Sequence, residues 1–455
     1  MEIGEVLLLG LGALAAVAWA CVYLTSPRRK EKRARSRVRP PMLLAVPMWL
    51  FTIFACLGAV LNRVGQVSLN VSIWNVVSPV FALFFAGVTV MMWRRPGAPN
   101  KALVMMGFAY FVAQLVSLLI NGQAGVGYDN QVFSLVYIPG TLVLIRAVDA
   151  TREQLLRLAL HISLAVVYLS VIVGALAPGV GYGTDYGDVR RLPIFGLTYR
   201  LAGITPHQNL LSVTAVIAII LCVYMRARLW PLSVAVCLLA IGMAESRNAA
   251  ITVVVLAVFA WLIAGKSLGA KLVLSVPLAV LGWLYLPSLF ASEDAGILTA
   301  DASNFNTRSE IWDSVIYHWD DRFLFGWGPL AFQERAATPF PSLRFLNAHN
   351  QLLQAIAEAG LIGLIAMAGF IVAMIAIAWR HRTEVIYPCL VLALVISMAT
   401  EVFFTVHLYG LSYAAVPAML SLAILMSADA RTDGHENESE SVDGGAVDVL
   451  PVRTV

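Results

Sequence analysis

Three ionisable side chains lie beside apolar stretches of the sequence, where they could carry chemistry: Arg247, Arg308 and His349. A guanidinium group stays charged and its planar fork matches phosphate oxygens, so arginines can hold a diphosphate and stabilise it as it leaves. A neutral imidazole can accept the proton of a hydroxyl group as that oxygen attacks an anomeric carbon. These residue types therefore predict a transfer reaction in which arginine supplies the charge stabilisation that Mg²⁺ would otherwise give.

His349 lies in the segment NAHNQLLQAIAEAGLIG (347–363), which ends the longest polar interval and begins an apolar one. Apolar residues then recur at spacings of three and four, which predicts a helix. His349 and Asn350 fall at its expected start, where the first turn faces water. Gly360 and Gly363 leave little bulk on adjacent turns, which favours close approach of a neighbouring helix. An interfacial histidine with a capping asparagine is the alternative.

Arg308 lies in TRSEIWDSVIYHW, where Thr307 and Glu310 match a capping box that begins a helix. The apolar and aromatic residues that follow form one face, as expected of a helix lying on the outer membrane surface. A Gly-Trp-Gly turn at 326–328 comes next. This arrangement favours a ligand site at the membrane surface, with a solvated or headgroup-bound arginine as the alternative.

Arg247 lies in AESRNAAI, which interrupts an otherwise continuous apolar region. A charge so close to lipid is costly and usually faces a cavity or a partner, so a function is favoured, with pairing to Glu245 as the structural alternative. Arg200, in GLTYRLAGITPHQN, is a third candidate. The sequence has no DxD pair, carboxylate cluster or metal-ligand spacing of His and Cys, so neither a metal site nor a cofactor is expected.

Composition predicts the elements that must position these residues. Of 455 residues, 60% are hydrophobic and 13% charged, whereas about a quarter are charged in soluble proteins. A membrane helix needs roughly 20 apolar residues, and the chain supplies about a dozen such runs. We therefore expect an all-α polytopic membrane protein with about 12–13 transmembrane helices and a large extracytoplasmic loop. Membrane lipid is an expected partner and nucleic acid is not.

The basic residues predict how the chain is oriented. The first apolar run is followed by PRRKEKRARSRVRP, an order that indicates a retained helix rather than a cleaved signal peptide and places this loop in the cytoplasm. The expected organisation has four parts: transmembrane helices 1 to 10 with an external loop at 178–207 within residues 1–290, an extracytoplasmic loop with an interfacial helix at 291–357, transmembrane helices 11 to 13 at 358–427, and a disordered cytoplasmic tail at 428–455.

Together these segments resemble the O-antigen ligase and O-antigen polymerase superfamily of bacterial lipid-linked glycan transferases. The resemblance covers roughly residues 200–363. It rests on AHNQLLQAIAEAGLIG, on TRSEIWDSV with the later FGWG, on AESRNAA and on LAGITPHQNLLS, in the order that the family shows. The additional first helix and the acidic tail depart from the family pattern, and they leave open whether the protein is a ligase, a polymerase or a transferase for another surface polymer.

The resemblance implies a metal-independent, GT-C-like enzyme of the bacterial inner membrane with its active site on the extracytoplasmic face. Such enzymes move a glycan from undecaprenyl diphosphate to an acceptor glycan or glycolipid. Carried onto this chain, His349 is the expected catalytic base, and Arg247 and Arg308 are expected to bind the diphosphate of the donor. The resemblance also implies supporting positions at Arg200, His207, Asn209, Asn350 and Glu358.

A transporter or flippase for a lipid-linked glycan or small anion is the alternative function. Such proteins place ionisable groups at mid-membrane on broken helices. His161 is the best single indication of transport in this sequence, and a hydrogen-bonded core histidine explains it as well. The other informative groups gather at the expected outer face, which favours the transferase.

Overall fold

The structure is a computed structural model, and it describes residues 42–65, 101–123, 151–182, 199–226, 229–263, 308, 310–332, 338–340, 347–404, 421–422 and 424–425. In these residues the regular structure is helical, apart from one isolated bridge between Tyr182 and Leu201. The expected first helix, Thr307 of the expected capping box, and the tail at 428–455 lie outside the described residues. The predicted all-α fold class is confirmed.

The described helices follow the predicted apolar runs closely. Their bounds are α2 Met42–Arg63, α4 Lys101–Ile120, α6 Arg152–Leu176, α7 Pro178–Gly181, α8 Gln208–Met225, α9 Trp230–Ala244, α10 Arg247–Ile263, the 3-10 turn η4 Asp320–Arg322, α13 Gln351–Arg380 and α14 Ile386–Met398. By length and composition α6, α8 and α13 could each cross a membrane, and α2, α4, α9, α10 and α14 contain shorter apolar stretches. The total of about 12–13 spans stays a prediction.

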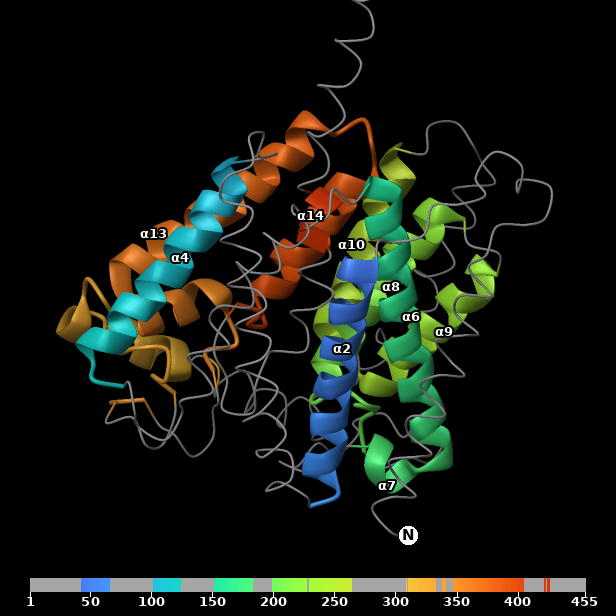
Figure 1. The fold of residues 1–455 in the computed structure, drawn as a ribbon, viewed down its shortest axis with the longest axis horizontal. Coiled ribbons are helices and arrows are strands. Elements are labelled where there is room, and N and C mark those ends of the chain that lie inside the picture. The colour runs from blue at the N-terminus through green and yellow to red at the C-terminus, as the bar shows by residue number, and fades with distance from the viewer. Residues whose placement is uncertain are drawn as a thin grey trace, which may run out of the picture.

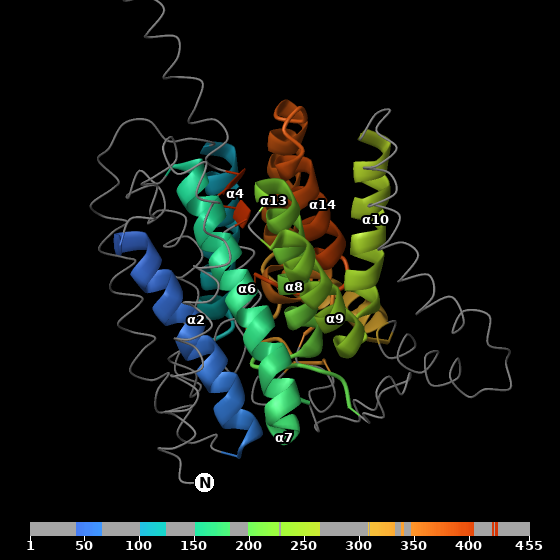
Figure 2. The ribbon, with the colours of Figure 1, turned by 90° about the vertical axis from the view of Figure 1, so that its right-hand side faces the viewer.

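The helices form two groups joined through α14. In one group α8 packs against both α9 and α6, and in the other α13 packs along α4. α14 contacts α13 on one side and α8 and α10 on the other. Figure 1 shows the α4–α13 pair on the left and the larger group on the right, and Figure 2 shows α2 and α10 at opposite edges.

Several helices end near α7, at the end of the bundle that is here called the site end (Figure 1). Arg63, the last residue of α2, donates to the carbonyl groups of Val180 (3.0 Å), Gly203 and Thr205. The N–H group of Leu201 donates to the carbonyl of Met243 near the end of α9 (2.9 Å). These bonds tie the segment that precedes α8 to its neighbours.

At the opposite end, here called the far end, Arg152, the first residue of α6, joins several helices. Its guanidinium group pairs with Glu384 in the turn between α13 and α14, and donates to Tyr224 near the end of α8 (2.5 Å). It also lies 4.8 Å from the ring centroid of Tyr387. Because α6 and α14 begin here while α8 and α13 end here, neighbouring helices run in alternating directions.

α13 is broken at Gly360, whose φ of 61° and ψ of −150° leave the helical region. The loop at 323–328 fills the break with its main chain. Hydrogen bonds run from Trp327 N to Ala357 O (2.8 Å), Gly328 N to Glu358 O (3.0 Å), Leu361 N to Phe323 O (2.8 Å) and Ile362 N to Leu324 O (3.3 Å). A neighbouring helix was expected beside Gly360, and the structure places this loop there instead, because a break frees main-chain groups that must find partners.

The segment after Arg308 is helical at 310–317, as predicted. Ile311 and Val315 of its apolar face are each 1% exposed and pack in a small core with residues of the later loop and of α13. Ile316 and Tyr317 on its other side are exposed. The expectation of one lipid-facing apolar face is wrong for Ile311 and Val315, because this helix covers the start of α13 with them.

Candidate functional site

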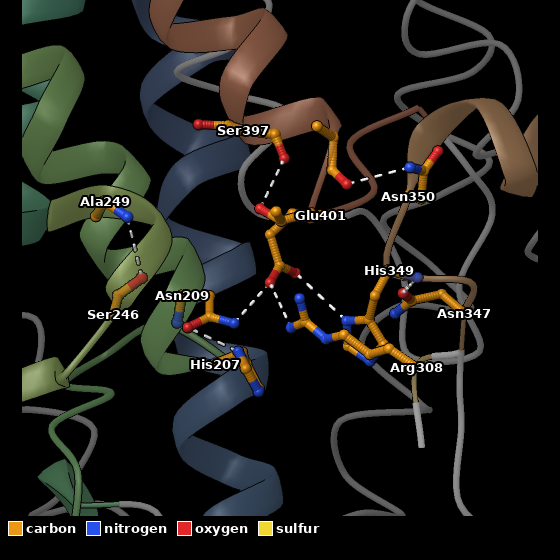
Figure 3. A network of polar contacts seen from close by, with 12 residues as sticks. His207, Asn209, Ser246, Ala249, Arg308, Asn347, His349, Asn350, Ser397 and Glu401 are labelled. Atoms are coloured by element: carbon orange, nitrogen blue, oxygen red, sulfur yellow. Dashed lines mark hydrogen bonds and ion pairs between the residues drawn. The ribbon is translucent and has the colours of Figure 1, made fainter. Parts of the chain in front are cut away.

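Glu401 lies at the centre of a polar cluster at the site end (Figure 3). It follows α14 by three residues, outside the helix, and its side chain is 7% exposed. Its Oε1 atom accepts a hydrogen bond from Asn209 Nδ2 (2.6 Å) and lies 3.7 Å from Arg308 Nη2. Its Oε2 atom lies 3.8 Å from His349 Nδ1. One carboxylate therefore faces three nitrogen groups from three distant parts of the chain.

Each partner is held by the start of a helix. Asn209 is the second residue of α8, after the N-cap residue His207. His349 immediately precedes Asn350, the N-cap of α13, whose Oδ1 accepts from the N–H groups of Leu352 and Leu353 (3.0 and 3.1 Å). Short polar side chains at N-caps satisfy N–H groups that the helix leaves unpaired. The residues around Glu401 are thus fixed by local helix geometry.

The charges around Glu401 decide its ionisation. Burial alone favours the neutral acid, but the close approach and charge of His349 and the charges of His207 and Arg308 outweigh it. Together they lower the pKa of Glu401 from 4.5 to about 2. The carboxylate is therefore ionised at neutral pH and can hold cationic or hydrogen-bond-donating partners in place.

His349 adopts an unusual backbone conformation, and the Nδ1 atom of its ring faces Glu401. Its φ is 49°, in the left-handed region that few non-glycine residues occupy. Its N–H group donates to Asn347 Oδ1 (2.7 Å). Its Nδ1 atom is buried and has no hydrogen-bond partner among the described residues, although Glu401 is near. A proton on Nδ1 would point toward the carboxylate and leave Nε2 as a proton acceptor.

Two further predicted positions, Arg200 and His207, lie beside Asn209. Arg200 donates to the carbonyl groups of Ala244 (2.8 Å) and Glu245 (3.1 Å), and its Nη2 atom donates to Asn209 Oδ1 (3.3 Å). The Nδ1 atom of His207 accepts from the N–H group of Asn209 (3.2 Å). Arg200 and His207 therefore orient Asn209 toward Glu401.

Asn350 contributes on the opposite side of the carboxylate. Its Nδ2 atom donates to the carbonyl oxygen of Ala399 (3.1 Å), in the turn that leads from α14 to Glu401. The N–H group of Glu401 donates to Ser397 O (2.8 Å), which continues that turn (Figure 3). The start of α13 is thereby joined to the end of α14.

The last two predicted positions lie on α10 and α13. Arg247 is the first residue of α10, is exposed, and follows Glu245, whose carbonyl accepts from Arg200. Glu358 is fully buried on α13, facing α4. Its carboxylate accepts hydrogen bonds from Gln354 (2.7 Å), Gln114 (2.5 Å) and Tyr110 (3.3 Å). Glu358 is therefore part of the α4–α13 contact.

Sequence reasoning missed Glu401. The signal was present, because Glu401 interrupts the apolar sequence SMATEVFF at the end of a predicted span, and ionisable groups in such places are costly. Its partners lie at Asn209, Arg308 and His349, so only the tertiary structure reveals that it has any. Within the described residues, no group of three or more His, Cys, Asp and Glu side chains is arranged to hold a metal ion.

The fold and the charged cluster define a helical membrane protein with a polar site at one end of its bundle. Residues 232–368 match the family model described as O-antigen ligase. Over this segment the match bears out the predicted resemblance to the O-antigen ligase and polymerase superfamily, and it supports a glycosyltransferase of that type. A search of curated proteins found no match.

The matched segment runs from α9 into α13 and includes Arg247, Arg308 and His349. It ends before Glu401 and begins after Asn209. The cluster therefore joins residues inside the family segment to residues on both sides of it.

Proposed function

We propose that the protein transfers a glycan from undecaprenyl diphosphate to a hydroxyl group of an acceptor glycan or glycolipid on the extracytoplasmic face of the bacterial inner membrane. His349 is the catalytic base in this proposal. Arg308 and Arg247 bind the diphosphate of the donor, and Glu401 orients the imidazole. The convergence of His349, Arg308 and Asn209 on one buried carboxylate is the observation that carries the proposal.

The chemical step follows from the position of the imidazole. The acceptor hydroxyl gives its proton to Nε2 of His349 while its oxygen attacks the anomeric carbon of the donor. The bond from that carbon to the diphosphate oxygen breaks, and its electron pair leaves with the diphosphate. Glu401 then faces an imidazolium group, whose charge its ionised side chain stabilises.

The arginines stabilise the charge that develops on the leaving group. Arg308 is 29% exposed and lies 3.7 Å from Glu401, so its fork of N–H groups is within reach of both the carboxylate and a ligand. Arg247 is exposed at the start of α10, where the positive end of the helix dipole also favours an anion. Guanidinium groups take the part of a divalent cation in this proposal.

The remaining predicted residues support the site. Arg200 and His207 hold Asn209 against Glu401, and Asn350 ties the His349 turn to the end of α14. Glu358 supports the site through the packing of α13 on α4. The acceptor, and with it the choice between ligation and polymerisation, is set by surfaces beyond these contacts.

Transfer by the purified protein tests the proposal. The full chain in lipid nanodiscs would be given an undecaprenyl-diphosphate-linked glycan and candidate acceptors, with and without a chelator. We expect transfer that persists with the chelator, and loss of transfer in His349→Ala at unchanged protein level. Wild-type transfer by His349→Ala would remove this residue from the mechanism, and transfer lost with the chelator would assign the charge stabilisation to a metal ion.

Arg308→Lys tests the diphosphate contact separately. Lysine keeps the charge but lacks the planar fork that matches two phosphate oxygens. We expect the KM for the donor to rise about tenfold, the loss of one good charge-assisted contact. Arg382→Lys at the far end is the matched control. An unchanged KM in Arg308→Lys would argue against direct binding of the diphosphate by Arg308.

A further inference from the structure

The first turns of α13 carry two glutamines that are almost completely buried. Gln351 is 0% exposed and Gln354 is 2% exposed. A buried amide is costly unless its oxygen and nitrogen are both hydrogen-bonded, so each side chain should have specific partners. Both have partners in the structure, and these partners include main-chain groups beside the two central residues of the candidate site.

Gln351 holds the chain that follows Glu401. Its Oε1 atom accepts from the N–H groups of Phe403 (2.8 Å) and Phe404 (3.0 Å), and its Nε2 atom donates to the carbonyl of Phe404 (3.2 Å). Residues 401–404 have left the helix and need other partners for these groups. Asn350, which precedes Gln351, donates to Ala399 on the other side of Glu401. Two adjacent residues at the start of α13 therefore hold the chain before and after Glu401.

Gln354 holds the turn that carries His349. Its Oε1 atom accepts from the N–H group of Ala348 (2.7 Å), and its Nε2 atom donates to Glu358 Oε1 (2.7 Å). Trp312 Nε1 donates to the carbonyl of the same Ala348 (2.9 Å). Both polar groups of Ala348 are thus fixed immediately before His349, the residue with the left-handed backbone.

We propose that Gln351 and Gln354 are positioning residues, which together set the separation between His349 and Glu401. Neither is assigned a contact with substrate. The inference rests on the proposed function, in which His349 is the base and Glu401 its partner. His349 and Glu401 are about fifty positions apart in the sequence. The start of α13 fixes their separation because it bonds to the main chain next to each of them.

The glutamine amides suit this task better than apolar packing would. Apolar contacts are non-directional, whereas a hydrogen bond to a main-chain group fixes both distance and direction. The separation of 3.8 Å between His349 Nδ1 and Glu401 Oε2 already exceeds hydrogen-bond length. A further displacement of about 1 Å can lower a rate by roughly 100-fold.

Replacement by methionine, which has similar length and no amide, tests the proposal in the full chain in nanodiscs. For Gln351→Met and Gln354→Met we expect kcat to fall at least about tenfold, with the KM for the donor within about twofold of wild type. The rate would be expressed per donor-binding site, counted by titration with the lipid-linked donor. Loss of folded protein lowers the number of sites, whereas misplacement of His349 lowers the rate at each site.

Thr52→Val is the matched control, because it also removes one buried hydrogen bond, from Thr52 Oγ1 to Met48 O (2.7 Å) on α2. It should leave the rate per site unchanged. A rate per site that falls equally in Thr52→Val would overturn the positioning role, since any buried hydrogen bond would then have the same effect.

A charge swap between Gln354 and Glu358 provides a second test. Gln354→Glu keeps an oxygen for the Ala348 N–H group but places two carboxylates together, so the rate per site should fall. Adding Glu358→Gln reverses the donor and acceptor between these positions and should bring the rate per site back to within about threefold of wild type. If Gln354→Met fails to fold, this pair of variants decides the question.

The outcomes separate this inference from the proposed function. Loss of transfer in His349→Ala with a wild-type rate per site in both glutamine variants would overturn the positioning role alone. Wild-type transfer by His349→Ala would overturn both. A low rate per site in the double variant, equal to that of Gln354→Glu, would also overturn the role of Gln354.

Discussion

Glu401 combines two properties that rarely occur together, since its side chain is nearly buried and yet ionised. Its partners compensate the cost of burial, with one hydrogen bond from Asn209 and two nearby cationic or ionisable groups, Arg308 and His349. Removal of its charge should therefore affect both the imidazole and the stability of the site.

Glu401→Gln should lower kcat by about 10- to 100-fold while the KM for the donor changes little, because the amide cannot stabilise an imidazolium as a carboxylate does. Steady-state transfer with a lipid-linked donor measures both constants. Glu384→Gln makes the same replacement in the Arg152 pair at the far end and should leave kcat unchanged. Equal kcat values for the two variants would argue against a role for Glu401 in the chemical step.

The lowered pKa of Glu401 also predicts how stability depends on pH. In the folded protein the pKa is about 2, against 4.5 for the unperturbed group. The stabilisation is therefore fully present above pH 4.5 and is lost as the pH falls toward 2. The difference in thermal midpoint between wild type and Glu401→Gln should be largest near neutral pH and should shrink below about pH 4. A difference that is constant with pH would contradict the assignment.

At the scale of elements, the break in α13 is the feature that sequence patterns described least well. The spacing of apolar residues predicted the helix, and Gly360 was expected to admit a neighbour. The pattern marked Gly326 and Gly328 only as a turn, and it could not show that this turn is the neighbour that bonds to α13 through its main chain. The break joins the loop after Arg308 to the helix after His349.

Gly360→Ala should destabilise the protein strongly. At a φ of 61° and ψ of −150° a side chain is strained, and a Cβ atom would lie 2.5 Å from the carbonyl carbon of Leu324. Gly65→Ala is the control, because Gly65 also has a positive φ of 78° but no atom within 4 Å of an added Cβ. Thermal unfolding in nanodiscs should show a clearly larger loss for Gly360→Ala. Equal losses would mean that backbone strain alone, and not the docked loop, constrains Gly360.

For the whole molecule, the two ends of the bundle carry different groups. The site end holds Glu401 and its partners, and the far end holds Arg152 with Glu384 and the exposed Arg382. The bias of basic residues toward the cytoplasm predicts that the far end faces the cytosol.

Cysteine labelling tests this orientation. Tyr317 is 79% exposed beside the site, and Thr383 is exposed in the turn between α13 and α14. A membrane-impermeant maleimide added to spheroplasts should label Tyr317→Cys at once and Thr383→Cys only after permeabilisation. The parent chain supplies the background, since its described cysteines are buried. The reverse pattern would place the candidate site in the cytosol and exclude the proposed donor.

Sequence patterns predicted most of the described helices, because an apolar run of membrane length is a local feature that can be recognised without tertiary information. They also selected His349 and Arg308, which the structure places at one carboxylate. Glu401 and Gln351 escaped notice because their partners are far away in the sequence. Gln354 escaped notice because its bond to Ala348 depends on the fold of the turn before α13. A buried amide has no recognisable motif until its partners are known.

The docking of the 323–328 loop into the break has a consequence for natural variation. Main-chain atoms make the attachment, so its demands on residue type fall on Gly326 and Gly328, where an added Cβ atom would lie 2.6 Å from Gly360 N and 2.1 Å from Gln123 Oε1. Phe323 and Leu324 bond to α13 through their carbonyl oxygens, and they are 43% and 49% exposed. A lineage could thus vary these two exposed side chains while the loop stays docked at Gly360.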